Sequence, residues 1–176
     1  MASFDVCYDF MMDNEDPKRE YAIVPDVGGS AIAGVNSKDW PIQFQKIARL
    51  PADQRGPLVA IFYQQEFWNA WYAQLTSDEV AKRVFDAAVN CGPRTAIEIL
   101  QRTINQIALK MAAPGNHLLI VDEGWGPHTV ESANALDPAG LVPAFCAERA
   151  LHYQAIVAKN PADAKYLQAW LERAMK

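Results

Sequence analysis

Apolar residues recur at the spacing of one buried helix face along most of the chain. Between Phe4 and Met11 they fall at positions i, i+3, i+4 and i+7, and Ser3 stands where an N-cap is favoured. The same spacing returns in four later stretches, at about 80–91, 97–111, 138–159 and 163–175. The pattern predicts an all-α protein whose first helix ends near Asn14.

Capping and breaking residues place the boundaries of the later helices. Ser77 is a typical N-cap before one helix, and Gly92-Pro93 ends it and opens the next. We expect that next helix to be the longest and to run until Pro114-Gly115. Pro51 favours the start of an earlier helix, and a short helix is expected over 129–136.

The helical spacing fails between Glu15 and about Asn36. Pro25, Gly28, Gly29 and Gly34 lie in this stretch and favour turns. We therefore expect an irregular or short β-hairpin segment directly after the first helix.

Composition and charge limit the class of protein. The 176 residues are 51% apolar and 21% charged, which is ordinary for one globular domain, so we expect a single domain over 1–176. The net charge is −5 and the basic residues form no stripe, so nucleic acid is excluded as a partner. We expect a monomer.

No residue pattern predicts a metal site or a cofactor. Cys7, Cys91 and Cys146 are widely spaced among apolar neighbours, which favours buried thiols over a disulfide framework or zinc. The three histidines have no metal-ligand spacing with any carboxylate. We therefore expect no metal and no cofactor.

The N-terminal residues and the length of the apolar runs indicate where the protein is expected to be made. The chain begins without the basic and apolar regions of a signal peptide, and no apolar run approaches the length of a membrane span. We expect a protein made in the cytoplasm, without a signal peptide and without stable membrane insertion.

Two carboxylates bracket the irregular segment. Glu15 and Asp26 lie eleven residues apart, and a folded-back loop would bring them within the ~5–9.5 Å that separates the carboxylates of a glycosidase. A glycosidase needs one carboxylic acid to protonate the leaving oxygen and a second group to steady a cation or activate water. Spacing alone favours the alternative that these are two solvated loop acids.

The surrounding motifs favour the first alternative. Phe4-Asp5-x4-Phe10-x4-Glu15, followed by Asp26-Val27-Gly28-Gly29-Ser30-x3-Gly34-Val35, resembles the start of glycosyl hydrolase family 108, a family of lysozyme-like N-acetylmuramidases. Four further blocks match in order: FYQQEFW (62–68), FDAAVNCGPRTAIEILQR (85–102), DEGWGPHTV (122–130) and the tail AERALHYQAIVAKNP…WLER.

The resemblance implies a lysozyme-like fold and assigns roles to residues. About 1–92 would be a muramidase-like half, and about 93–176 a helical, peptidoglycan-binding half. Glu15 would be the general acid and Asp26 the second carboxylate in cleavage of the β-1,4 bond between N-acetylmuramic acid and N-acetylglucosamine. The substrate-binding candidates are Ser30, Asn36, Tyr63, Trp68 and Asn90. For Trp68 core packing is the alternative to stacking on a sugar, and for Tyr63 and Asn90 a structural role is the alternative.

The first motif also departs from the family pattern. Asp16 and Pro17 replace two glycines after Glu15, the loop to Asp26 is longer by about two residues, and Ala31 and Asn36 stand where the family has threonine. A weakly active or inactive peptidoglycan-binding or scaffolding module is therefore the alternative to an enzyme. A helical interaction protein is a third, since core packing also produces similar patterns.

The expected partner in either main alternative is a glycan strand of peptidoglycan. A protein without a signal peptide reaches the cell wall either after phage-type release, as an endolysin does, or through dedicated export. The sequence leaves both routes open.

Overall fold

The first helix and the segment that follows it are arranged as the sequence predicts. The computed structural model describes residues 1–111 and 118–176. It is mostly helical, with one small antiparallel sheet after the first helix, so the predicted lysozyme-like, mostly α fold class is confirmed.

The sheet has one strand more than the predicted hairpin. Its strands pair in the order β1-β2-β3, with Val24 opposite Ala31 and Ile32 opposite Val35. The link between β2 and β3 is a two-residue turn in which Ala33 and Gly34 both have positive φ, 45° and 81°, as hairpins prefer. Helix α1 and the strands span Phe4–Glu15 (α1), Val24–Asp26 (β1), Gly29–Ile32 (β2) and Val35–Asn36 (β3).

Short helices connect the sheet to the centre of the molecule. The prediction of a helix starting at Pro51 was wrong by one turn: residues 52–54 form a 3-10 turn, and the α-helix begins at Gly56, with Pro57 in its first turn. The sequence analysis did not identify α2 or α4. The elements are α2 (Pro41–Ala48), η1 (Ala52–Gln54), α3 (Gly56–Glu66) and α4 (Ala70–Gln74).

The remaining helices follow the predicted boundaries closely. The Ser77 hydroxyl accepts a hydrogen bond from the N–H of Val80, and Gly92 separates two long helices with φ of 93°. The second of these is described to Met111; the predicted end at Pro114-Gly115 lies outside the described residues. The helices are α5 (Asp78–Cys91), α6 (Pro93–Met111), α7 (Pro127–Ala135), α8 (Pro138–Lys159), η2 (Pro161–Asp163) and α9 (Ala164–Ala174).

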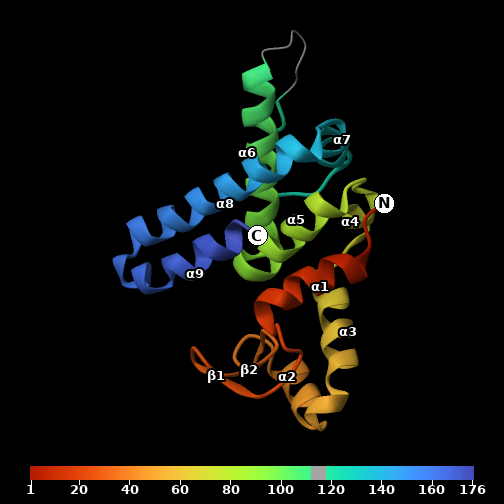
Figure 1. Ribbon diagram of the computed structural model, residues 1–176, viewed down its shortest axis with the longest axis vertical. Helices are drawn as coiled ribbons and strands as arrows, with labels where there is room; N and C mark the ends of the chain where they lie inside the picture. Colours follow the sequence, from red (N-terminus) through yellow and green to blue (C-terminus); the bar gives the residue numbers. More distant parts are fainter. Residues whose placement is uncertain (112–117) are drawn as a thin grey trace.

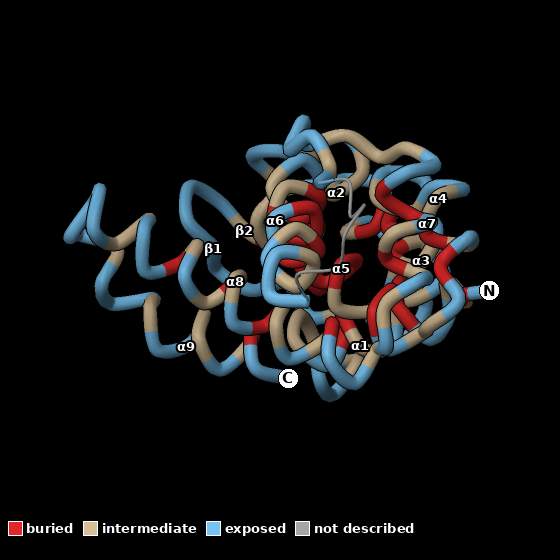
Figure 2. Tube along the Cα trace, turned by 90° about the horizontal axis from the view of Figure 1, so that it is seen from above, coloured by how far each residue is buried: buried red, intermediate tan, exposed pale blue. Residues whose placement is uncertain are grey.

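Helix α5 is the centre of the arrangement. It packs against α1, α6 and α8, and it is buried along much of its length (Figures 1 and 2). The helices α8 and α9 form an antiparallel pair that brings the C-terminus back beside α5, while the sheet, α2 and α3 lie on the opposite side of α1 (Figure 1). One continuous hydrophobic cluster contains residues from Ala2 to Phe145, so the buried core extends through both halves of the sequence.

None of the helices in the described part of the chain is both long and apolar enough to cross a membrane.

Candidate active site

Glu15 lies at the point where the first helix meets the last. It is the final residue of α1, and its Oε1 atom is 2.7 Å from Nη2 of Arg173 in α9. The Glu15 side chain is 17% exposed and that of Arg173 13% exposed. The carboxyl group is therefore partly open to solvent and is held by a guanidinium 158 positions later in the chain.

The Arg173 guanidinium is in turn anchored on Asp86, in the middle of α5. Nη2 of Arg173 lies 2.7 Å from Oδ1 of Asp86, and Nε donates to both carboxylate oxygens at 3.2 Å. Asp86 is fully buried and also accepts from Nη1 of Arg149 in α8, at 2.7 Å. Charged groups on α1, α5, α8 and α9 thus meet in one cluster, which we call the Glu15 ion cluster: Glu15, Asp86, Arg149 and Arg173.

The carboxylates keep both arginines of the cluster charged. Burial alone would lower the pKa of Arg173, but hydrogen bonds and charge from Asp86, together with the charge of Glu15, raise it above its usual value. The pKa of Arg149 is raised by Asp86 in the same way, against the effect of burial. Two negative and two positive groups therefore offset one another, as charges removed from water require.

A neighbouring polar contact fixes the end of α1 to the same cluster. Nδ2 of Asn14 donates to Oδ1 of Asp86 at 3.1 Å, and Oδ1 of Asn14 accepts from Nζ of Lys176 at 2.6 Å. The residue before Glu15 is thus bound to both α5 and the end of the chain. These contacts limit how far the Glu15 backbone can move.

On its other side, Glu15 packs against the β2–β3 turn. A Cβ atom built on Gly34 would lie 2.6 Å from Oε2 of Glu15 and would also overlap the hydroxyl of Tyr63. Only glycine allows the turn to approach so closely, and φ of 81° at this position also favours glycine. The Gly34 of the family-like motif therefore touches the carboxyl group of Glu15.

Tyr63 of α3 lies beside Glu15 and supports the same turn. Its hydroxyl donates to the carbonyl oxygen of Ala33 at 2.8 Å. Burial raises the pKa of Tyr63 well above its usual value, and the negative charge of Glu15 adds to this shift. Tyr63 therefore remains a neutral donor that holds the turn against the carboxyl group.

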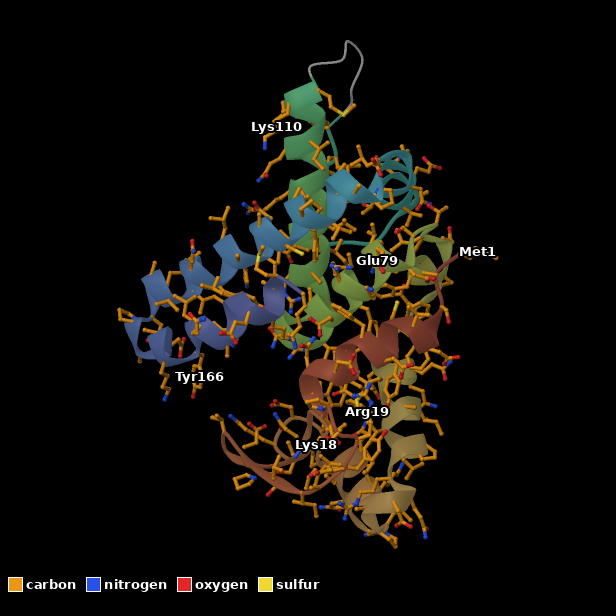
Figure 3. All side chains as sticks on the ribbon, in the orientation of Figure 1. Met1, Lys18, Arg19, Glu79, Lys110 and Tyr166 are labelled. Atoms are coloured by element: carbon orange, nitrogen blue, oxygen red, sulfur yellow. The ribbon has the colours of Figure 1, made fainter. Side chains whose placement is uncertain are left out.

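Asp16, the residue that replaces the first glycine of the family motif, turns away into its own loop. Its two carboxylate oxygens accept from the N–H groups of Glu20 and Tyr21, at 3.1 and 2.7 Å. Arg19 closes the same loop by donating to the Asp16 carbonyl at 2.9 Å, and Figure 3 shows Lys18 and Arg19 just beyond the end of α1. The charged group bound to the carboxyl of Glu15 is Arg173.

Asp26 has a much more open environment. It is the last residue of β1, faces Gly29 across the β1–β2 turn and is exposed. Its Oδ1 atom accepts from the N–H of Val27 at 2.7 Å. The second predicted carboxylate is thus presented at the tip of a hairpin, next to the turn formed by Val27 and Gly28.

Ser30 and Asn36 lie on the strands and take part in local hydrogen bonds. Ser30 and Ser37 are joined twice: the N–H of Ser30 donates to the Ser37 hydroxyl, and the N–H of Ser37 donates to the Ser30 carbonyl. Oδ1 of Asn36 accepts from the N–H groups of Lys38 and Asp39 at 3.0 and 2.8 Å. The Asn36 side chain therefore shapes the turn that follows β3.

Trp68 and Asn90 are half-buried and make contacts with neighbouring helices. Trp68 stacks on Tyr72 with ring centroids 5.1 Å apart and meets Phe4 edge to face at 5.6 Å. Asn90, on α5, accepts a hydrogen bond from the hydroxyl of Tyr153 on α8. Of the five substrate-binding candidates, Tyr63 lies against the Gly34 turn beside Glu15, whereas Trp68 and Asn90 pack between helices.

A separate pocket of about 560 Å³ lies in the C-terminal half. Gln101 of α6 shapes its floor, because its amide nitrogen donates to Asp122, Gly124 and Thr129, and its amide oxygen accepts from the N–H groups of Asp122 and Glu123. These hydrogen bonds fold the 122–130 block predicted to bind peptidoglycan. The pocket is lined by residues that include Leu119, Asp122, Trp125, His128 and Thr129.

The sequence patterns assign no site role to Arg149 or Arg173. A signal was present for Arg149, which continues the buried α8 positions Leu141, Phe145 and Tyr153 at a spacing of four. A charged residue in an apolar stripe requires a buried partner. Asp86 stands in the same way among the buried residues of α5.

Metal binding was examined over residues 1–111 and 118–176. In these ranges no group of three His, Cys, Asp or Glu residues is placed to hold a metal ion.

Two family models match the chain, and together they span most of it. Residues 23–92 match Glycosyl hydrolase 108, and residues 95–175 match a family described as a predicted peptidoglycan domain. The first range contains Asp26 and Gly34 but begins after Glu15. No curated protein matches the chain. The two matches support a glycoside hydrolase that acts on peptidoglycan. The predicted resemblance to glycosyl hydrolase family 108, with a peptidoglycan-binding region toward the C-terminus, is thus confirmed by the two matches.

Proposed function

We propose that the protein is an N-acetylmuramidase that cleaves the β-1,4 bond between N-acetylmuramic acid and N-acetylglucosamine, with Glu15 as the general acid. One observation carries this proposal. A single partly exposed carboxyl group is fixed by Arg173 on one side and by the Gly34 turn on the other, beside the segment that matches Glycosyl hydrolase 108.

The reaction needs one proton donor and water. Protonated Glu15 gives its proton to the glycosidic oxygen, and the bond between that oxygen and the anomeric carbon breaks with its electron pair going to the oxygen. Water then supplies the hydroxyl group at the anomeric carbon and releases a proton. Glu15 is left as a carboxylate, which Arg173 stabilises.

In this proposal the hairpin supplies the second carboxylate. Asp26 steadies the positive charge that develops on the sugar ring or activates the water, and its exposure leaves it free to approach a bound glycan. Ser30 and Asn36 on the sheet and Tyr63 beside Glu15 are the candidates for contacts with the sugar. The packing of Trp68 and Asn90 between helices favours their structural alternatives.

A binding or scaffolding module is the second candidate function. The pocket bordered by Asp122 and Trp125 favours it, because this pocket lies within the segment that matches the peptidoglycan domain and does not depend on Glu15. In both cases the protein acts at the cell wall, either as a bacteriolytic endolysin after phage-type release or after dedicated export.

Purified sacculi distinguish the two functions. The muramidase should release new reducing ends, and reduction with borohydride should convert the terminal sugar to N-acetylmuramitol. Glu15→Gln should abolish release while sedimentation with sacculi persists. Asp13→Asn is the matched control, because Asp13 is an exposed carboxylate on the same helix that pairs with Arg19.

The outcomes are distinct. Release by the wild type and by Asp13→Asn, with loss in Glu15→Gln, supports the enzyme. Sedimentation of all three proteins without any released reducing ends supports the binding module and rejects the muramidase. Reduced N-acetylglucosamine ends would show a glycosidase of a different bond specificity.

A further inference from the structure

We propose that Arg173 is a positioning residue for Glu15, so that the last helix of the peptidoglycan-binding half completes the active site of the hydrolase half. The inference rests on the proposed role of Glu15 as general acid. Its basis is the guanidinium that bridges Glu15 and the buried carboxylate of Asp86.

The contact selects which oxygen of Glu15 carries the proton. Nη2 of Arg173 is only a donor, and it points at Oε1 from 2.7 Å. Oε1 must therefore accept, and the proton of the acid form resides on Oε2. That oxygen lies against the Gly34 turn, where a side chain would displace it.

The anchor on Asp86 gives the guanidinium a fixed direction. Arg173 uses Nε and Nη2 toward Asp86 and Nη2 toward Glu15, and Asp86 is fully buried with Arg149 on its other oxygen. The planar guanidinium can make these contacts together, whereas a lysine ammonium is a point charge on a flexible stem. Arg173→Lys therefore keeps the charge and loses the geometry.

The cluster also fixes the position of the Glu15 carboxylate after proton transfer. With Glu15 ionised, the Glu15 ion cluster has two negative and two positive groups, and Arg173 bridges the two carboxylates. The seat of Arg173 on Asp86 therefore determines where the carboxylate of Glu15 lies.

The two matched segments thus share one reaction site. Arg173 lies within 95–175, the range matched by the peptidoglycan domain, while Gly34 and Tyr63, which confine Glu15 from the other side, lie within 23–92. Catalysis should consequently depend on how α9 is seated, even where glycan binding does not.

The test uses the full chain with Arg173→Met, Arg173→Lys and a control outside the Glu15 ion cluster, Arg102→Lys. Arg102 pairs with Glu98 on its own helix, α6. We expect Arg173→Met and Arg173→Lys to lower kcat on sacculi by about 10²-fold, the effect of a misplaced catalytic group, with KM near the wild-type value. Arg102→Lys should keep kcat per folded molecule.

A second measurement does not depend on activity. The ¹³C signal of the Glu15 carboxyl carbon, assigned by its absence in Glu15→Gln, should shift in both Arg173 variants and stay in place in Arg102→Lys. It also remains informative if one variant is too unstable for kinetics.

The results separate this inference from the function on which it rests. An active wild type, an inactive Glu15→Gln and Arg173 variants with unchanged kcat and an unmoved Glu15 signal would overturn the inference alone. Losses of kcat in the Arg173 variants that only match their unfolded fractions would also overturn it. A wild type that releases no reducing ends removes the proposed function, and the inference with it.

Discussion

The two carboxylates proposed for catalysis lie at opposite ends of one short segment and have opposite environments. Glu15 is held by groups from several helices and by the β2–β3 turn, and its neighbour Asp86 is fully buried. Asp26 is exposed at a hairpin tip and accepts one hydrogen bond from the next residue in the chain. The first is fixed by tertiary structure, and the second by a local turn.

Because of this difference, substitutions near Glu15 and at Asp26 should have different effects on activity and stability. Changes around Glu15 should affect both activity and stability, because its partners are buried charges that also join helices. Changes at Asp26 should affect activity alone, because an exposed hairpin carboxylate contributes little to folding. The following predictions test that contrast.

The largest effect is expected at Glu15 itself. Glu15→Gln keeps the size of the side chain and removes the transferable proton, so release of reducing ends from sacculi should fall by about 10²–10⁴-fold. Initial rates measured against equal amounts of folded protein would show this. Activity close to that of Asp13→Asn would remove Glu15 from the mechanism.

Arg149→Met tests whether the buried charges near Glu15 stabilise the fold. It leaves the buried carboxylate of Asp86 with one guanidinium fewer, and loss of one partner of a buried ion pair costs about 3–5 kcal/mol of the free energy of unfolding. Urea denaturation followed by circular dichroism is the measurement. A loss below about 1 kcal/mol would mean that the cluster does not hold the helices together.

Asp26→Asn tests the open carboxylate. Removing the charge should reduce the rate of glycan cleavage by about 10²-fold, as for one group that stabilises a transition-state charge. The free energy of unfolding should stay within about 0.5 kcal/mol of the wild type. A large loss of stability would show that Asp26 contributes to folding, and full activity would show that its charge is not needed for cleavage.

Gly34→Ala tests the close approach of the turn. The added Cβ would meet Oε2 of Glu15 and requires a positive φ, so the turn or the carboxyl must move, at a cost of about 1–3 kcal/mol. Gly92→Ala is the matched control, since Gly92 also has positive φ but has open space around it. Only Gly34→Ala should lose activity beyond its loss of stability.

The smallest effect is expected for an exposed carboxylate with cationic partners. Hydrogen bonds from Lys82 and then Arg83 lower the pKa of Glu79 below its usual 4.5. A lowered carboxylate pKa stabilises the fold above the unfolded value, and this contribution is lost as the pH falls through the folded value. Glu79→Gln should therefore destabilise by at most about 1 kcal/mol at pH 7.

That difference between Glu79→Gln and the wild type should vanish as the pH drops below the lowered pKa of Glu79 in the folded protein. Thermal unfolding of both proteins at several pH values checks the sign. A difference that grows toward acidic pH would contradict the assignment. The same series on Asp26→Asn would show whether the hairpin carboxylate behaves as another surface charge.

Local patterns were sufficient for the elements that they define. The apolar spacing identified α1, the Ser77 cap identified the start of α5, and Gly92-Pro93 identified its end. Helices α2 and α4 were missed because they are short and have few buried residues. A weak periodicity over five to eight residues cannot be distinguished from a loop.

Only part of the candidate site could be predicted from the sequence. Motif similarity located Glu15, Asp26 and the Gly34 turn. It gave no role to Arg173, since an arginine near the end of an amphipathic helix usually lies on the solvated face. Its contact with Glu15 depends on how α8 and α9 fold back onto α5.

The sequence by itself determined the helices, their caps, the turn-rich segment after Glu15 and the likeness to glycosyl hydrolase family 108, because each follows from residues close together in the chain. Only the tertiary structure decided that the carboxyl of Glu15 is confined between Arg173 and Gly34 while Asp26 stays open. The reason is physical: buried charges require partners, and packing supplied them from helices more than sixty residues away in the chain.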